Sequence, residues 1–92
     1  MIFTTGLDRA CQEEEALVNQ LDQNPEYVAW EARSTALERN RVTKAVNRND
    51  MEYRKKLEPG AAAFFDYLVA AADAYEKYDG VRPLWELEEL DW

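Results

Sequence analysis

The sequence contains no histidine and only one cysteine, Cys11, among its 92 residues. Without histidine, the chain lacks the commonest general base and the commonest ligand of catalytic zinc. A single cysteine cannot form a disulfide within the chain, and alone it cannot make a structural zinc site. Cys11 lies on the apolar side of an expected helix in acidic surroundings. We therefore expect it to be a small buried hydrophobic residue rather than a nucleophile.

Glycine and proline are also scarce, with three of each, and no long apolar run occurs. So few turn-forming residues disfavour a sandwich or a barrel. The most apolar stretch, AAAFFDYLVAAADAY, is interrupted by Asp66 and Asp73 and is too short to span a bilayer. The opening MIFTTGLDRA lacks the basic start and apolar run of a secretory signal. We therefore expect a cytoplasmic protein of a reducing compartment, with no membrane partner.

Sequence signatures of catalysis are missing as well. Neither a phosphate-binding glycine loop nor a cofactor fingerprint occurs, and the acidic residues lack the spacing of a metal-binding loop. Nineteen acidic side chains give many chance neighbours, so no catalytic carboxylate pair stands out. We expect no cofactor and no metal, and an enzyme is the least expected class.

Apolar residues that recur at steps of three and four predict an all-α fold. At 47% hydrophobic residues, the chain can fill one modest core. Asn24 followed by Pro25 marks the start of a helix, Pro59 starts another, and Gly80 ends it. We expect one domain over 1–92, a small helical bundle of three main helices plus a short C-terminal helical segment. The expected ranges are 6–22, 25–47, 59–79 and, for the C-terminal segment, 83–92.

The stretch NRND, residues 47–50, leaves two interpretations of the second helix open. Two asparagines and an aspartate within four residues compete with helical hydrogen bonds. Either one helix continues to residue 57, or the helix breaks and Asp50 caps a new turn. The pattern favours a break or a kink.

Charge is distributed unevenly along a chain whose net charge is −8. Residues 1–32 hold one basic and seven acidic side chains, residues 33–58 hold eight basic and four acidic ones, and residues 59–92 hold two basic and eight acidic ones. The simplest explanation is that the basic middle of the chain lies between its acidic neighbours and pairs with them. Such exposed pairs contribute only about 0–1 kcal/mol each, yet they can select which helices become neighbours.

The closing segment VRPLWELEELDW combines tryptophan and leucine with four acids, and it is too short to bury its own apolar side chains. It can cover the core as a lid, or it can dock onto a partner, and tryptophan suits protein interfaces. The leading prediction is a non-enzymatic protein-interaction module that self-associates or binds another protein, with acids of the first helix as a rim. The predicted contact residues are Trp85, Leu87, Leu90 and Trp92, together with Glu86, Glu88, Glu89 and Asp91.

The acidic composition of the chain suggests one alternative function. Carboxylates at steps of three and four on a helix lie about 5–6 Å apart, a spacing similar to that along a phosphate backbone. In general character the chain resembles small acidic helical inhibitors of nucleic-acid-binding proteins, such as phage anti-restriction and anti-CRISPR proteins. No motif of the chain matches such a family, so the resemblance assigns no residues. An inhibitor of this kind would bind through acidic side chains, for which the candidates are Glu13, Glu14 and Glu15, or the acids of residues 86–91.

The basic middle suggests a second alternative, direct contact with nucleic acid. Nucleic-acid-binding domains are usually basic overall, whereas both flanks of this chain are acidic. A protein partner or a second copy is therefore the expected partner, in preference to nucleic acid. The candidate basic patch comprises Arg33, Arg41, Lys44, Arg48, Arg54, Lys55 and Lys56.

Overall fold

The computed structural model describes residues 6–89, and over this range its regular structure is entirely helical. The predicted all-α class is therefore confirmed for the described residues. None of their helices is long and apolar enough to cross a membrane. The helices are α1 (Gly6–Asp22), α2 (Pro25–Arg33), α3 (Ala36–Asn47), α4 (Met51–Arg54) and α5 (Pro59–Asp79).

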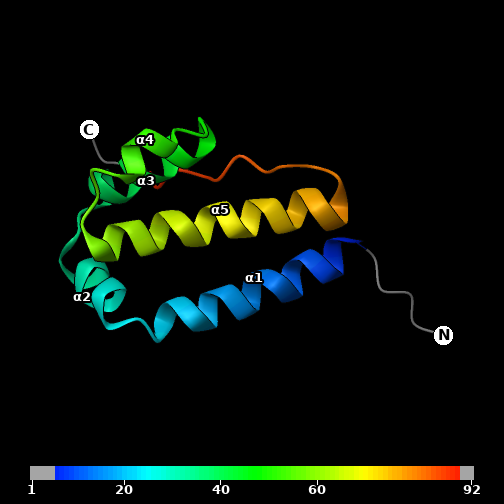
Figure 1. Cartoon of the computed structure of the whole chain (residues 1–92), viewed down its shortest axis with the longest axis horizontal. Coiled ribbons are helices and arrows are strands. Elements are labelled where there is room, and N and C mark those ends of the chain that lie inside the picture. The colour runs from blue at the N-terminus through cyan, green and yellow to red at the C-terminus, as the bar shows by residue number, and fades with distance from the viewer. Residues whose placement is uncertain (1–5, 90–92) are drawn as a thin grey trace.

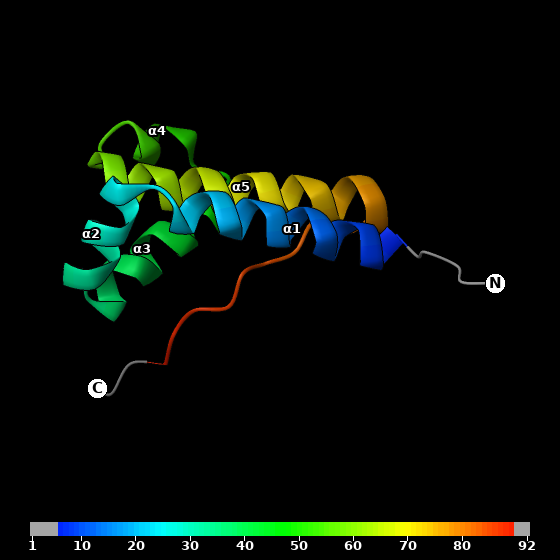
Figure 2. The same ribbon diagram turned by 90° about the horizontal axis from the view of Figure 1, so that it is seen from below.

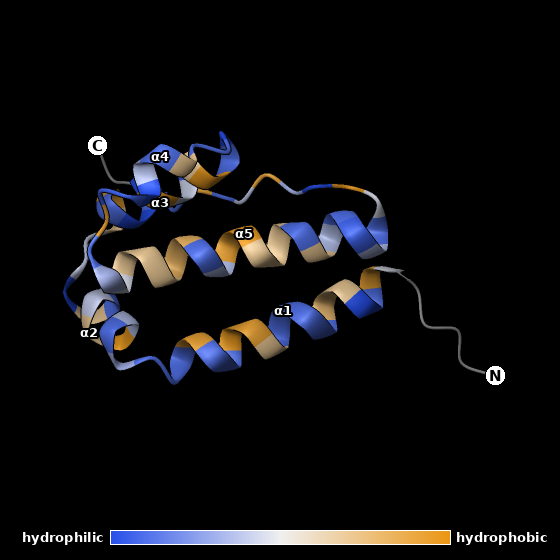
Figure 3. Ribbon diagram, viewed as in Figure 1, coloured by the Kyte–Doolittle hydropathy of each residue, from blue (hydrophilic) through white to orange (hydrophobic). Residues whose placement is uncertain are grey.

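Helix α5 is the centre of the molecule. Helix α1 runs antiparallel along its length, and α2 and α3 pack against it near its N-terminal end (Figure 1). The basic middle of the chain therefore does not lie between the two acidic flanks, as the charge pattern suggested. The two long acidic helices, α1 and α5, instead pack on each other, and both carry apolar residues along their length (Figure 3).

The hydrophobic core lies where α2, α3 and α5 meet. Phe65 of α5 is completely buried, and Trp30 of α2 is 3% exposed. The ring of Trp30 lies 5.5 Å from that of Phe64, a distance at which aromatic pairs attract. The core is formed by Trp30, Val42, Ala45, Val46, Ala61, Phe65 and Leu68. This core fixes the position of α3, on which the candidate site is built.

The helix expected over 25–47 is two helices, and the expectation of one was wrong. The chain leaves the helical path at Ser34 and Thr35, both of which have extended backbone. The hydroxyl of Thr35 accepts a hydrogen bond from the backbone N–H of Glu38 at 3.1 Å. Thr35 thereby caps a new helix, α3, with the threonine-to-glutamate spacing of a capping box.

The second helical region also breaks after Asn47 and does not continue to residue 57. Asn49 adopts a φ of 58°, which an asparagine tolerates better than most residues. The carboxylate of Asp50 then accepts a hydrogen bond from the backbone N–H of Tyr53 at 3.2 Å and caps α4. The expected break and the expected cap at Asp50 are both confirmed.

The predicted C-terminal helical segment is wrong for the residues that the structure describes. Residues 81–89, which we call the strap, contain no helix, and they run back from the end of α5 towards α3 (Figures 1 and 2). Gly80, with a φ of 78°, ends α5 in the left-handed conformation and turns the chain. Side chains of α3 supply hydrogen-bond partners for the backbone of the strap at Trp85 and Glu88. Leu90, Asp91 and Trp92 lie outside the described residues.

Candidate functional site

Two asparagines of α3, which we call the asparagine clamp, hold the backbone of the strap. The side chain of Asn47 donates to the carbonyl oxygen of Trp85 at 2.9 Å and accepts from the N–H of Trp85 at 2.7 Å. The side chain of Asn40 makes the same pair of bonds to Glu88, at 3.0 and 2.8 Å. A carboxamide offers an acceptor beside a donor, as the edge of a β-strand does. The clamp therefore satisfies extended backbone at two positions.

Trp85 anchors the strap against α5. Its indole N–H donates to the carbonyl oxygen of Leu68 at 3.1 Å, and its ring meets the ring of Tyr75 edge-on at 6.0 Å between centroids. Trp85 is half-buried and packs against the main core. The polar edge of the indole has a partner and its apolar body is partly covered, so Trp85 closes one side of the core.

Glu88 anchors the strap against α3. The guanidinium of Arg39 donates to both carboxylate oxygens of Glu88, at 2.9 and 3.1 Å. Arg39 also donates to the carbonyl and hydroxyl oxygens of Ser34, at 2.9 and 3.0 Å, which fixes the guanidinium at the junction of α2 and α3. The hydrogen bonds from Arg39 lower the pKa of Glu88 below its ordinary value. A charged carboxylate therefore fits this position better than a neutral one.

Arg82 makes a third contact between the strap and the helices, donating to Asp73 and Glu76 of α5. The residues that face the helices, Arg82, Trp85 and Glu88, are spaced by three. This spacing is that of an extended chain with three residues per turn rather than of a flat β-strand, in which alternate residues share a face.

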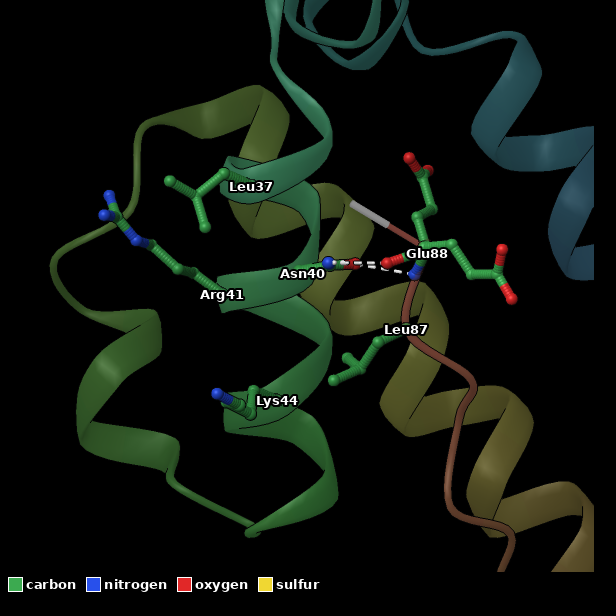
Figure 4. Close-up of a pocket in the computed structure, with 7 residues that line it drawn as sticks. Leu37, Asn40, Arg41, Lys44, Leu87 and Glu88 are labelled. Carbon is green, nitrogen blue, oxygen red and sulfur yellow. Dashed lines mark hydrogen bonds between the residues drawn. The ribbon is translucent and has the colours of Figure 1, made fainter. Parts of the chain in front are cut away.

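One outward row of residues on the strap is apolar. Val81 is 63% exposed, Leu84 76% and Leu87 42%, and these residues also recur at every third position. Leu87 leans towards α3 across a surface pocket of about 460 Å³, which Leu37, Arg41 and Lys44 line from the other side (Figure 4). The site thus presents exposed leucines from two segments that are far apart in the sequence.

The predicted contact residues of the C-terminal segment therefore point in different directions. Trp85 and Glu88 face the body of the same chain, whereas Glu86, Leu87 and Glu89 are exposed. The remaining predicted residues, Leu90, Asp91 and Trp92, lie outside the described residues.

The three glutamates of the alternative acidic patch do not share one face. Glu13 and Glu15 are exposed, but Glu14 accepts hydrogen bonds from the hydroxyls of Tyr67 and Tyr75, at 3.3 and 2.9 Å. Burial, together with the charge of Glu14, raises the pKa of Tyr67 to about 12. Glu14 joins α1 to α5 and is not available as part of an exposed acidic row.

Cys11 is exposed, so the prediction of a buried residue was wrong. Its Sγ lies 3.4 Å from the hydroxyl oxygen of Tyr75, at the edge of the contact between α1 and α5. The apolar stripe of α1 is narrower than its sequence pattern suggested, because the helix meets only α5 along most of its length.

The candidate basic residues are likewise divided. Arg33 pairs with Glu58, Arg54 with Asp66 and Lys55 with Glu52. The other four have no ion-pair partner among the described residues. Three of them follow one side of α3 and its C-cap, because their positions differ by three and by four. These four are Arg41 and Lys44 of α3, Arg48 at its C-cap, and Lys56.

Sequence reasoning missed Arg39, Asn40 and Asn47 as residues of this site. Asn40 and Asn47 lie seven positions apart, which places both on one face of α3. Asn40 is buried although it is polar, and such a residue requires hydrogen-bond partners. Two asparagines on the buried side of an expected helix were therefore a signal that something polar packs there.

The ion pair between Arg39 and Glu88 predicts that docking of the strap weakens at low pH. The pKa of Glu88 is lowered in the folded chain, so the pair stabilises docking fully at pH values above the ordinary glutamate pKa of 4.5. This contribution is lost as the pH falls through the lowered pKa. We expect the NMR signal of the Trp85 indole N–H to shift towards that of an exposed indole below pH 4.5.

Glu88→Gln provides the control for this titration. The variant should lose most of the acid-dependent shift, because its amide has no proton to gain in this pH range. An identical shift in both proteins would show that Glu88 does not control docking.

The strap and the face of α3 beneath it form the best-defined candidate site. The described residues contain no group of three or more cysteine, aspartate or glutamate side chains arranged to hold a metal ion. Comparisons with protein-family models, with curated proteins and with solved structures gave no match to this chain.

Proposed function

We propose that this chain is a non-enzymatic protein-interaction module that self-associates through the outer face of the strap and the adjoining face of α3. One observation carries the proposal. Val81, Leu84 and Leu87 remain exposed although the backbone that bears them is held at two points by the asparagine clamp. Covering a leucine of this kind contributes about 1.5–3 kcal/mol, and little ordering entropy opposes it because the backbone is already fixed.

Charges around this face favour a second copy as the partner. Arg41 and Lys44 of α3 and Glu86 and Glu89 of the strap have no ion-pair partner within the described range. In a twofold pair the same surface meets itself, so the cations of one copy can face the acids of the other. Such a pairing offsets part of the repulsion between two chains that each carry a net charge of −8.

Leu87→Asp tests the proposal by sedimentation velocity over a range of protein concentrations. We expect the wild-type chain to form dimers and the variant to be monomeric, with affinity reduced by about 100-fold, because a buried leucine is lost and a charge is placed in the contact. Leu7→Asp is the matched control, since Leu7 is 48% exposed on α1, and it should dimerise like the wild type.

A wild-type chain that stays monomeric up to millimolar concentration would contradict self-association. Equal effects of Leu87→Asp and Leu7→Asp would place the contact elsewhere. The two alternatives suggested by charge, imitation of nucleic acid and direct binding of nucleic acid, remain predictions, and no contact among the described residues favours either.

A further inference from the structure

The inner face of the strap supports a separate inference that does not rest on the proposed function. The asparagine clamp binds only the backbone of the strap, through one N–H and one carbonyl oxygen at each of two residues. Any residue except proline supplies both groups. The clamp therefore recognises extended chain as such, and it does not require the strap's particular sequence.

The spacing of the clamp sets a register. Asn40 and Asn47 lie two helical turns apart, about 10.5 Å along α3. The two residues that they hold, Trp85 and Glu88, are three apart, and three residues of extended chain cover about 9–10 Å. The two lengths match, so an extended segment can occupy both asparagines without a bend.

Side-chain preferences come from α3 and α5. At the first clamped position the carbonyl oxygen of Leu68 accepts from an indole N–H, and at the second Arg39 binds a carboxylate through two nitrogens. Arg39 is already positioned by Ser34. The helices therefore favour an extended segment with a tryptophan and, three residues later, an acid.

The strap lies in a groove that is lined by residues of α3 and α5, and it fills this groove incompletely. Trp85 is only half-buried, and the Glu88 side chain is 50% exposed. Gly80 and four further residues connect the first clamped residue to α5, and Arg82 among them is held by α5. So short a connection favours the chain's own strap over that of a second copy, since a tethered segment has an effective concentration of the order of millimolar.

We propose that the groove between α3 and α5 is a peptide-binding site for an extended, acidic segment of a partner protein with a tryptophan and an acid three residues apart. The strap fills this site as a tethered ligand, and a partner segment of the same chemistry competes with it. Binding through backbone hydrogen bonds with side chains held at intervals is the way in which extended peptides are recognised on sheet edges. Here a helix supplies the hydrogen bonds.

The test uses the full chain with Trp85→Pro and Glu88→Pro, which removes both side-chain anchors of the tethered segment and both backbone N–H groups that the clamp binds, and leaves the residues of α3 and α5 unchanged. A fluorescein-labelled synthetic peptide of residues 81–89 is titrated with this chain, and its anisotropy is measured. We expect saturable binding, and at least tenfold weaker binding to the wild-type chain, whose own strap competes. A peptide with Trp85→Ala, or a receptor that also carries Asn47→Ala, should bind at least tenfold more weakly.

Three results would overturn the proposal. The first is equal binding of the peptide to the wild-type and the variant chain, and the second is equal binding of the two peptides. The third is displacement of the labelled peptide by unlabelled wild-type chain as effectively as by free peptide, which would make the strap of a second copy the occupant.

A second experiment applies if the variant chain loses its helical circular dichroism. A protease site is inserted between Gly80 and Val81 of the wild-type chain and cut, and the fragments are separated by size exclusion. The strap fragment should stay bound, and excess peptide of residues 81–89 should release it, whereas the Trp85→Ala peptide should not. Loss of the fragment on cutting, or its release by both peptides, would contradict a peptide-binding groove.

Discussion

Replacing both Asn40 and Asn47 by alanine is expected to release the strap from α3 while the helices remain folded. The two side chains make four hydrogen bonds to the strap, each worth about 1 kcal/mol, so docking should lose roughly 4 kcal/mol. The helical core should persist because neither side chain belongs to its apolar cluster. Cleavage after Glu86 by a glutamate-specific protease should accelerate by about 100-fold or more, with nearly unchanged helical circular dichroism.

Asn19→Ala is the control for this pair of substitutions. Asn19 is an exposed asparagine of α1, so its replacement should leave cleavage after Glu86 at the wild-type rate. If the double variant is cleaved no faster than this control, the asparagines do not hold the strap. Global unfolding of the double variant would instead show that the strap is required for the core.

Gly60→Ala is expected to destabilise the fold, although alanine is the better helix former by about 1 kcal/mol. A Cβ at residue 60 would lie 2.4 Å from the carbonyl oxygen of Glu26 and 2.4 Å from the Cβ of Trp30. Neither is the far end of a flexible side chain, so α2 and α5 must move apart. We expect the free energy of unfolding to fall by about 1–3 kcal/mol, measured by urea denaturation.

Gly80→Ala separates crowding from backbone conformation. Apart from residue 80 and its two chain neighbours, no residue has an atom within 4 Å of a Cβ at this position, so only the left-handed φ of 78° opposes the substitution. We expect Gly80→Ala to lower the free energy of unfolding by about 1–2 kcal/mol, from backbone conformation alone. Stabilisation by Gly60→Ala would contradict the close approach of α2 and α5.

The long helices could be predicted because their signals are local. Residues that restrict or free the backbone mark three of their ends. The structure places Pro25, after the cap Asn24, and Pro59 in the first turns of helices, and it places Gly80 at a C-cap. The break at Thr35 was also encoded locally, by the threonine-to-glutamate spacing of Thr35 and Glu38. It was missed because the apolar periodicity continues across it.

The strap could not be predicted because its hydrogen-bond partners are distant in the sequence. Trp85 and Glu88 recur at a helix-like spacing, and periodicity alone favours a helix there. The asparagines that hold these residues lie 38 and 48 positions away along the chain. In the sequence the asparagines of NRVTKAVNRND indicate only a weak helix. Their role emerges when α5 brings α3 and the strap together.

Amide hydrogen exchange along the strap, resolved by NMR, tests the central claim that α3 holds residues 81–89 in extended form. The N–H groups of Trp85 and Glu88 should be protected by their bonds to Asn47 and Asn40, while those of Glu86, Leu87 and Glu89 should exchange rapidly. Protection of two amides that are three positions apart, with exchange between them, is not expected for a helix, which protects consecutive amides. It is not expected for a free tail either. Continuous protection through residues 85–89, or none at Trp85 and Glu88, would contradict the account.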